Sequence, residues 1–82
     1  MSPWRTEDGN ETLGNLRAGC RAAVVDVTQA MRGELRLREL GFAPGEMVEV
    51  ILAGDTLLVR LGEQRLCLRK ETADGVSVSP FY

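Results

Sequence analysis

Three short runs in the second half of the chain alternate apolar and polar residues, and only two residues separate each run from the next. The runs cover residues 46–53, 56–61 and 64–70, joined by Gly54-Asp55 and Gly62-Glu63. Period-two alternation is typical of strands, and Gly at the first central position suits a type II′ hairpin turn. The pattern therefore predicts three consecutive antiparallel strands. Their common apolar face would carry Val48, Val50, Leu52, Leu57, Val59, Leu61, Leu66 and Leu68.

Two further strands complete the predicted sheet. Residues 21–28 alternate around β-branched side chains, and a last strand contains Val76 and Val78. Five short strands in a chain of 82 residues must curl to hide their edges and share one core. We therefore expect a mostly β fold, a small five-stranded barrel with one short helix after the first strand.

The helix is predicted over residues 33–42, together with the way it ends. Leu37 and Leu40 lie three apart among charged residues. Gly41 stands where a helix favours a left-handed residue, and Phe42 would then pack on Leu37, as in a Schellman motif. Pro44 and Gly45 suit the two central positions of a type II turn, which leads into the next strand.

The remaining sequence sets the expected boundaries and compartment. Residues 1–11 are polar and read as a flexible N-terminal tail, residues 12–79 as the domain, and residues 80–82 as a C-terminal tail. No run is apolar and long enough to span a membrane, and the first residues do not resemble a signal peptide. We therefore expect a cytoplasmic protein with free thiols at Cys20 and Cys67.

The sequence lacks the residue type and the motifs that catalytic and metal-binding sites most often use. The chain contains no histidine, which is the commonest general base and the commonest protein metal ligand. Its two cysteines form no CxxC motif, and no glycine-rich phosphate loop precedes a helix. We expect no enzyme activity, no cofactor and no metal site within the monomer.

Three separated segments resemble the FeoA family, in the order in which that family carries them. They are TLGNLRAG (12–19), RLRELGFAPGEMVEV (36–50) and LCLRKETADGVSV (66–78). The residues that match the family's motifs are Arg36, Leu37, Leu40, Gly41, Phe42, Pro44, Gly45, Leu68, Arg69 and Ala73. Most of them are also what a short helix and its stop require, so we interpret them as mainly structural.

The resemblance implies an SH3-like barrel and a protein partner. FeoA proteins are small cytosolic accessories of ferrous-iron transport, a system that handles a transition metal ion. The expected partner is the membrane transporter FeoB, through its cytoplasmic G-protein domain. Relatives usually carry a longer loop where this chain has Gly54-Asp55, so a contact made by that loop would be lost here. The alternative is a stand-alone SH3-like regulatory module related to the C-terminal domain of metal-dependent repressors.

A docking surface is predicted on the outward side of the helix. Met31 and Leu35 are four residues apart, and Leu35 lies about 200° around the helix from Leu37. An apolar pair on an exposed face, flanked by Arg32, Arg36 and Arg38, is typical of a protein-binding patch. In the alternative interpretation, Met31 covers one end of the barrel.

The sequence offers two other candidate surfaces, a basic strand face and the edge of the last strand. Arg60, Arg65 and Arg69 lie on strand faces opposite the leucines, where a solvated face is the simplest interpretation. A nucleic-acid site would interleave aromatic residues there, and these strands contain none, so we expect no nucleic-acid binding. We also expect no membrane insertion, because no run of residues is apolar and long enough to span a membrane. The edge of the last strand, with Pro80-Phe81-Tyr82, suits self-association by strand addition into a homo-oligomer.

Overall fold

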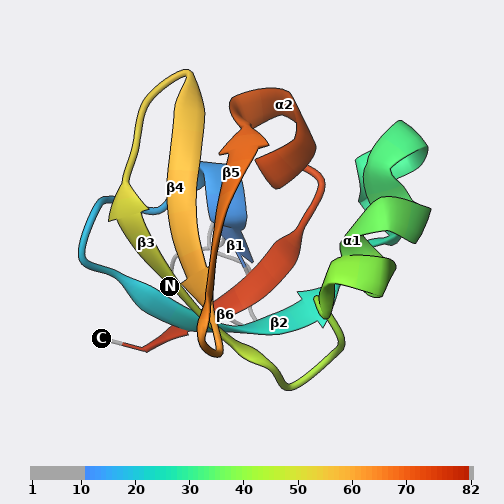
Figure 1. Ribbon diagram of the computed structural model, residues 1–82, viewed down its shortest axis with the longest axis horizontal. Coiled ribbons are helices and arrows are strands. Elements are labelled where there is room, and N and C mark those ends of the chain that lie inside the picture. Colours follow the sequence, from blue (N-terminus) through green and yellow to red (C-terminus); the bar gives the residue numbers. More distant parts are fainter. Residues whose placement is uncertain (1–10, 82) are drawn as a thin grey trace, which may run out of the picture.

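A curved antiparallel sheet forms the body of the protein. The computed structural model describes residues 11–81, with the side chains of residues 31 and 32 excepted. Each strand pairs antiparallel with its neighbours in the order β1-β6-β2-β3-β4-β5. Figure 1 shows β4 and β5 turned steeply against β2 and β6, so that the sheet curls over its inner face. The strands are β1 (Glu11–Thr12), β2 (Arg21–Asp26), β3 (Met47–Leu52), β4 (Thr56–Leu61), β5 (Gln64–Arg69) and β6 (Ser77–Phe81).

The five predicted strands are confirmed as β2 to β6, and the sheet is SH3-like, with β1 and β5 unpaired with each other in the described part. β1 is a sixth strand that the sequence did not predict, because two residues show no alternation. The ordered sheet therefore extends one residue into the predicted N-terminal tail and two residues into the predicted C-terminal tail. Glu11 pairs with β6 instead of belonging to a tail, and β6 pairs with β2 as far as Phe81, beyond the predicted boundary at residue 80. The rest of the predicted tails, residues 1–10 and 82, lies outside the described residues.

Four short helical elements connect the strands: η1 (Leu13–Asn15), η2 (Thr28–Gly33), α1 (Glu34–Leu40) and α2 (Lys70–Ala73). The predicted helix over residues 33–42 is confirmed as α1, and η2 precedes it as a 3-10 helix. The sequence predicts a plain connection over residues 71–75, where most of α2 lies, and this prediction is wrong. Four residues are too few to show a helical period, and of them only Ala73 is buried.

The predicted end of α1 is confirmed. Gly41 adopts a left-handed conformation with φ 108°, and its N–H donates to the carbonyl of Arg38 at 3.1 Å. The N–H of Phe42 donates to the carbonyl of Leu37 at 3.0 Å, which completes the Schellman pattern. Phe42 and Leu37 are 0% and 1% exposed, so the apolar contact of this motif lies in the core.

The turn that follows also has the predicted form. Gly45 has φ 93°, and the N–H of Glu46 donates to the carbonyl of Ala43 at 3.0 Å. Positive φ at the third residue is what a type II turn requires, and Gly adopts it without strain. The N–H of Gly45 also donates to the carbonyl of Val24 at 2.7 Å, which ties this turn to β2.

The two hairpins differ, although their turn sequences are alike. Leu61 pairs with Gln64 around a two-residue turn, and Gly62 has φ 63°, as predicted. Gly54 has no such positive φ, so the type II′ turn predicted there is wrong. The β3–β4 register shifts at a bulge between residues 50 and 52, so the last pair of this hairpin is Leu52 with Leu58, and the connection is longer than the predicted two-residue turn.

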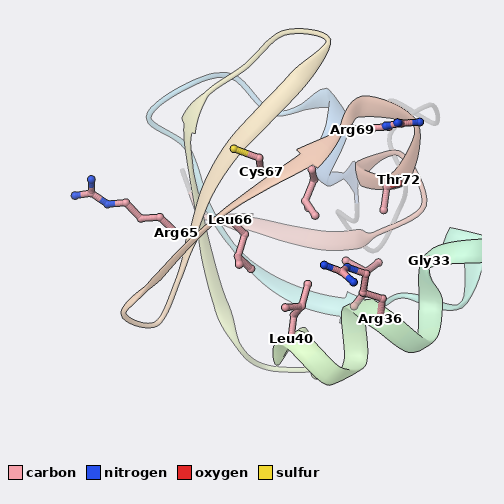
Figure 2. A pocket seen from close by; sticks show the side chains of 10 residues that line it. Gly33, Arg36, Leu40, Arg65, Leu66, Cys67, Arg69 and Thr72 are labelled. Atoms are coloured by element: carbon pink, nitrogen blue, oxygen red, sulfur yellow. The ribbon is translucent and has the colours of Figure 1, made fainter.

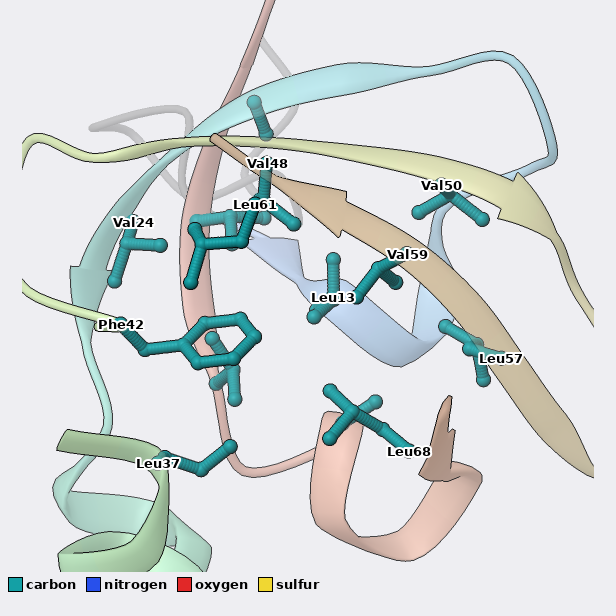
Figure 3. Packing of buried hydrophobic residues seen from close by; sticks show 14 of the residues in the cluster. Leu13, Val24, Leu37, Phe42, Val48, Val50, Leu57, Val59, Leu61 and Leu68 are labelled. Carbon is teal, nitrogen blue, oxygen red and sulfur yellow. The ribbon is translucent and has the colours of Figure 1, made fainter. Parts of the chain in front are cut away.

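The alternating leucines and valines fill the inside of the sheet. Figure 3 shows Val48 and Val50 of β3 beside Leu61 and Val59, their partners on the neighbouring strand β4, on the inner face of the sheet. No polar or charged residue is buried in the described part. Leu52 is the exception to the predicted apolar face, with 60% exposed, because the bulge pairs it with Leu58 and turns it outward. The core comprises Leu13, Leu16, Ala22, Val24, Val27, Ala30, Leu37, Phe42, Val48, Val50, Leu57, Val59, Leu61, Leu68, Ala73, Val76 and Val78.

Candidate functional site

A groove of about 410 Å³ separates α1 from β5, and we call it the α1–β5 groove. Pockets of this size accommodate side chains or small ligands. One wall comes from α1 and the residue before it, and the other from β5 and α2, which follow each other in the chain but are distant from α1 in sequence. The lining residues are Gly33, Arg36, Leu37, Leu40, Arg65, Leu66, Cys67, Leu68, Arg69 and Thr72.

The floor of the groove is apolar because the apolar side of α1 and the apolar inner face of β5 both contribute leucines to it. Leu37 and Leu40 lie three apart on one side of α1, and Leu66 and Leu68 lie two apart on the inner face of β5. Figure 2 shows Leu66 pointing from β5 toward Leu40 of α1. Leu37 and Leu68 are buried in the core, while Leu40 and Leu66 are only partly buried, so an apolar surface remains at the groove.

Both ends of the groove are bounded by close contacts. At the hairpin end, Gln64 Nε2 donates to the carbonyl of Leu40 at 3.1 Å. At the other end, Gly33 lies so close to α2 that a Cβ atom built on it would stand 3.2 Å from Thr72 Cγ2. These contacts set the separation between the helix and the strand.

The charged residues that line the groove are all basic, although Arg69 also borders a second hollow lined by Asp55, Glu71 and Asp74. Arg36, Arg65 and Arg69 are exposed and line it, and no acidic residue does. None of the three belongs to an ion pair in the part of the chain that the structure describes, whereas Arg38 pairs with Glu34 at 2.8 Å. The chain as a whole has a net charge of −2, so this basic rim is a local feature.

The structure divides the predicted docking residues between two sides of α1. Leu35 is 69% exposed on the outward side, as expected, and Arg38 lies there in its ion pair with Glu34. Arg36, by contrast, lines the groove. Met31 belongs to η2, and its side chain is not among those that the structure describes.

The residues of the family motif are placed mostly as structural elements. Gly41, Phe42, Pro44 and Gly45 form the helix stop and the turn, where they fix the path of the chain into β3. Leu68 and Arg69, with Leu37 and Leu40, also line the groove. The groove itself has no signal in the sequence, because Thr72 and the edge of β5 come near α1 only through tertiary packing.

Groups suited to metal or acid–base chemistry do not gather in residues 11–81. No three His, Cys, Asp or Glu side chains lie together there as metal ligands would, and Cys20 and Cys67 are free thiols. The only resolved pKa shift in the described part is at Asp26, whose pKa is lowered because its carboxylate accepts a hydrogen bond from the Thr28 hydroxyl. None of the helices in this range is long and apolar enough to cross a membrane.

The open, curved sheet and the groove at its edge define the class: a small SH3-like module with a surface suited to binding. Residues 11–80 match the family model described as the FeoA domain. The chain therefore belongs to the FeoA family, which confirms the resemblance inferred from its three motifs. No curated protein sequence matches the chain.

Solved structures agree with this assignment. FeoA of Stenotrophomonas maltophilia, crystallised with zinc and described as a prokaryotic SH3 domain protein, is 36% identical, with a TM-score of 0.76 over 87% of this chain and 95% of that one. FeoA of Chlorobium tepidum is 30% identical, with a TM-score of 0.78 over 87% of this chain and 70% of that one.

A repressor of another class shares only the fold. IdeR of T. acidophilum matches with a TM-score of 0.76 at 15% identity, over 85% of this chain and 33% of that one. Identity at this level supports no transfer of function. The alternative hypothesis of a stand-alone regulatory module related to repressors is therefore supported by the shared fold alone.

Proposed function

We propose that this protein is a non-enzymatic, cytoplasmic accessory of bacterial ferrous-iron uptake that docks on the FeoB transporter and regulates or assembles it. The observation that carries the proposal is the FeoA-domain match over residues 11–80, nearly the whole described chain. The 36% identical protein of S. maltophilia is described as a candidate activating factor of ferrous-iron transport, which supports the same role here.

We place the docking surface on the outward side of α1, extending to the rim of the groove. Leu35 supplies an apolar centre that the protein itself leaves uncovered in the described structure. Arg36 and Arg38 flank it with positive charge, and Met31 lies one turn earlier in the chain. A central apolar anchor with a polar rim is the usual composition of a protein interface. The cytoplasmic G-protein domain of FeoB is the partner that we expect there.

Replacing Leu35 with Asp tests this surface. We expect the variant to fold normally, because the side chain is largely exposed, and to lose most of its affinity for the G domain, since a charge would enter an apolar contact. An NMR titration of the ¹⁵N-labelled protein with the G domain, in GDP and in a GTP analogue, measures the effect.

Leu52→Asp is the matched control, because Leu52 is similarly exposed but lies at the end of β3. Unchanged binding by Leu35→Asp would refute the proposed surface while leaving the function standing. If the wild-type protein causes no shifts with the G domain in either nucleotide state, the proposed partner region is wrong.

A further inference from the structure

The outer edge of β5 has no strand partner in the described part of the chain. β5 pairs with β4 alone, and the α1–β5 groove is lined by five consecutive β5 residues, 65–69. A groove lined by consecutive residues runs along the edge of a strand, because residues on one face would be every second one. The groove therefore exposes backbone as well as side chains.

The pairing register identifies which backbone groups face the groove. A two-residue hairpin begins with a hydrogen-bonded pair, here Leu61 and Gln64, and such pairs then alternate with non-bonded ones. The bond from the N–H of Lys70 to the carbonyl of Asp55, at 2.9 Å, fits this alternation at the far end. The N–H and C=O groups of residues 65, 67 and 69 therefore point away from β4, toward the groove.

A strand added at this edge would place its side chains in two different environments. Side chains directed to the inner face would lie between Leu66 and Leu68 of β5 and Leu37 and Leu40 of α1, the apolar floor. Those directed to the outer face would lie beside the exposed residues of β5, of which Arg65 and Arg69 are basic. Side chains of a strand alternate between faces, so the edge selects alternating apolar and acidic residues.

Of the two outward arginines, Arg65 is the one without acidic neighbours in the described part of the chain, because Arg69 also borders a hollow lined by Asp55, Glu71 and Asp74. Arg65 is directly opposite Arg60 on β4, and like charges in cross-strand positions reduce stability. Arg60 is compensated by Glu49 at 2.7 Å, but Arg65 has no acidic partner in the described structure. Arg36 adds a third positive charge from the opposite wall.

We propose that the α1–β5 groove binds an extended segment of a partner protein as an added strand on β5, with apolar side chains entering the groove and acidic ones facing Arg65 and Arg69. The backbone bonds would supply affinity, and the alternation would supply specificity, as in other cases of strand addition. The inference deepens the proposed function, on which it rests only for the assumption that the protein binds another protein. Its test needs no transporter.

The probe is a capped nine-residue peptide in which valine and glutamate alternate. We expect its addition to shift the amide signals of Arg65, Cys67 and Arg69, and to slow hydrogen exchange at these three amides. A peptide of the same composition, with its valines in one block and its glutamates in another, is the matched control. It should bind at least about fivefold more weakly, since it cannot satisfy both faces at once.

Charge reversal provides the second measurement. The double variant R65E/R69E should lose about tenfold or more in affinity for the valine–glutamate peptide and should gain affinity for a peptide of alternating valine and lysine. Both residues are exposed, and Glu at position 65 would face Arg60, so we expect the fold to persist. The variant R17E/R21E, with the same change of net charge away from the groove, should bind like the wild type.

Three results would overturn the inference. A basic strand edge can also serve only to prevent self-pairing, and this role predicts no binding of the acidic peptide at millimolar concentration. Equal affinity for the alternating and block peptides would mean general charge attraction. Concentration-dependent shifts on β5 without peptide would assign the edge to a second copy of the chain. If the protein binds the G domain but not the valine–glutamate peptide, the strand-addition site is refuted and the proposed function is not. If it binds the peptide but not the G domain, the proposed partner is refuted and the strand-addition site is not.

Discussion

The two ends of the helical arm, residues 28–40 comprising η2 and α1, are fixed to the sheet in opposite ways. The C-terminal end is held by the buried pair Leu37 and Phe42, by two backbone bonds around Gly41, and by the turn that follows. The N-terminal end has a polar contact at the surface, from the Thr28 hydroxyl to the Asp26 carboxylate, and no side-chain cap on either helix. Its buried contact is small: Ala30 is 8% exposed, and its N–H donates to the carbonyl of Val27 at 3.0 Å.

The difference indicates that the position of the arm beside β5 depends more on its C-terminal end, where the large side chains of Leu37 and Phe42 are buried, than on its N-terminal end, where the small Ala30 is the buried side chain among those described. Buried apolar contacts and satisfied backbone bonds resist displacement, whereas an exposed hydrogen bond competes with water. We therefore expect variants at the C-terminal end to affect global stability and variants at the N-terminal end to act locally.

Leu37→Ala should have the largest effect. The side chain is 1% exposed in the core, and removing a buried leucine costs about 2–5 kcal/mol of unfolding free energy. For a domain of this size, that is a large part of the total stability. Urea denaturation measures the loss, with Leu35→Ala as the control, which should change stability by no more than about 0.5 kcal/mol. Similar losses for both variants would contradict the described orientation of α1.

Gly41→Ala should follow, with a loss of about 1–2 kcal/mol. The reason is conformational, because φ is 108° and the added Cβ would meet only an ordinary contact, 3.4 Å from Leu61 Cδ2. Replacement by Asn, which tolerates left-handed backbone better, should lose less than replacement by Ala. Thermal melts of the three proteins give the order, and an Ala variant as stable as the wild type would exclude a strained cap.

Gly33→Ala tests the other end of α1 and should change stability by less than about 1 kcal/mol. Its backbone, at φ −100°, is open to any residue, and Ala favours helix, but the new Cβ would lie 3.2 Å from Thr72 Cγ2. We expect local chemical-shift changes at Thr72 and along β5, reporting a wider α1–β5 groove. A loss as large as that of Gly41→Ala would refute the contrast between the two ends.

Thr28→Ala should give the smallest effect, visible mainly in acid. The pKa of Asp26 is lowered chiefly by the Thr28 hydroxyl, so its stabilising contribution is present above the unfolded pKa, about 3.8, and is lost as the pH falls through the folded value. Removing the hydroxyl should move the pKa of Asp26 upward. A ¹³C-carboxyl titration measures this change, with Gln29→Ala as the control; no change would show that the Thr28 hydroxyl does not set the pKa.

Local sequence signals predicted the features whose causes are local. Leu37, Gly41 and Phe42 specify the helix stop within six residues, and Gly62 specifies its hairpin, so both were predicted and confirmed. The alternation also predicted which residues of β4 fill the core. In each case, neighbouring residues impose the conformation before tertiary contacts act.

The features that escaped prediction depend on contacts between distant segments. Gly54 has the same turn signal as Gly62, yet Gly54 does not adopt the positive φ of a type II′ turn. A bulge in β3 shifts the register there and turns Leu52 outward. Arg65 and Arg69 were recognised as a basic face, but nothing in their spacing indicated that α1 would approach the free edge beside them. A groove between segments 25 residues or more apart has no local signature.

The position of β6 has a consequence for how the chain is made. β6 pairs with β2 on one side and with β1 on the other, so the last strand of residues 11–81 lies between the two earliest strands of that range. During synthesis, β2 to β5 can pair as they emerge, but the sheet stays incomplete until residues 77–81 have left the ribosome. Pairing over so long a separation is slow, and the nascent chain must remain free of aggregation until β6 arrives.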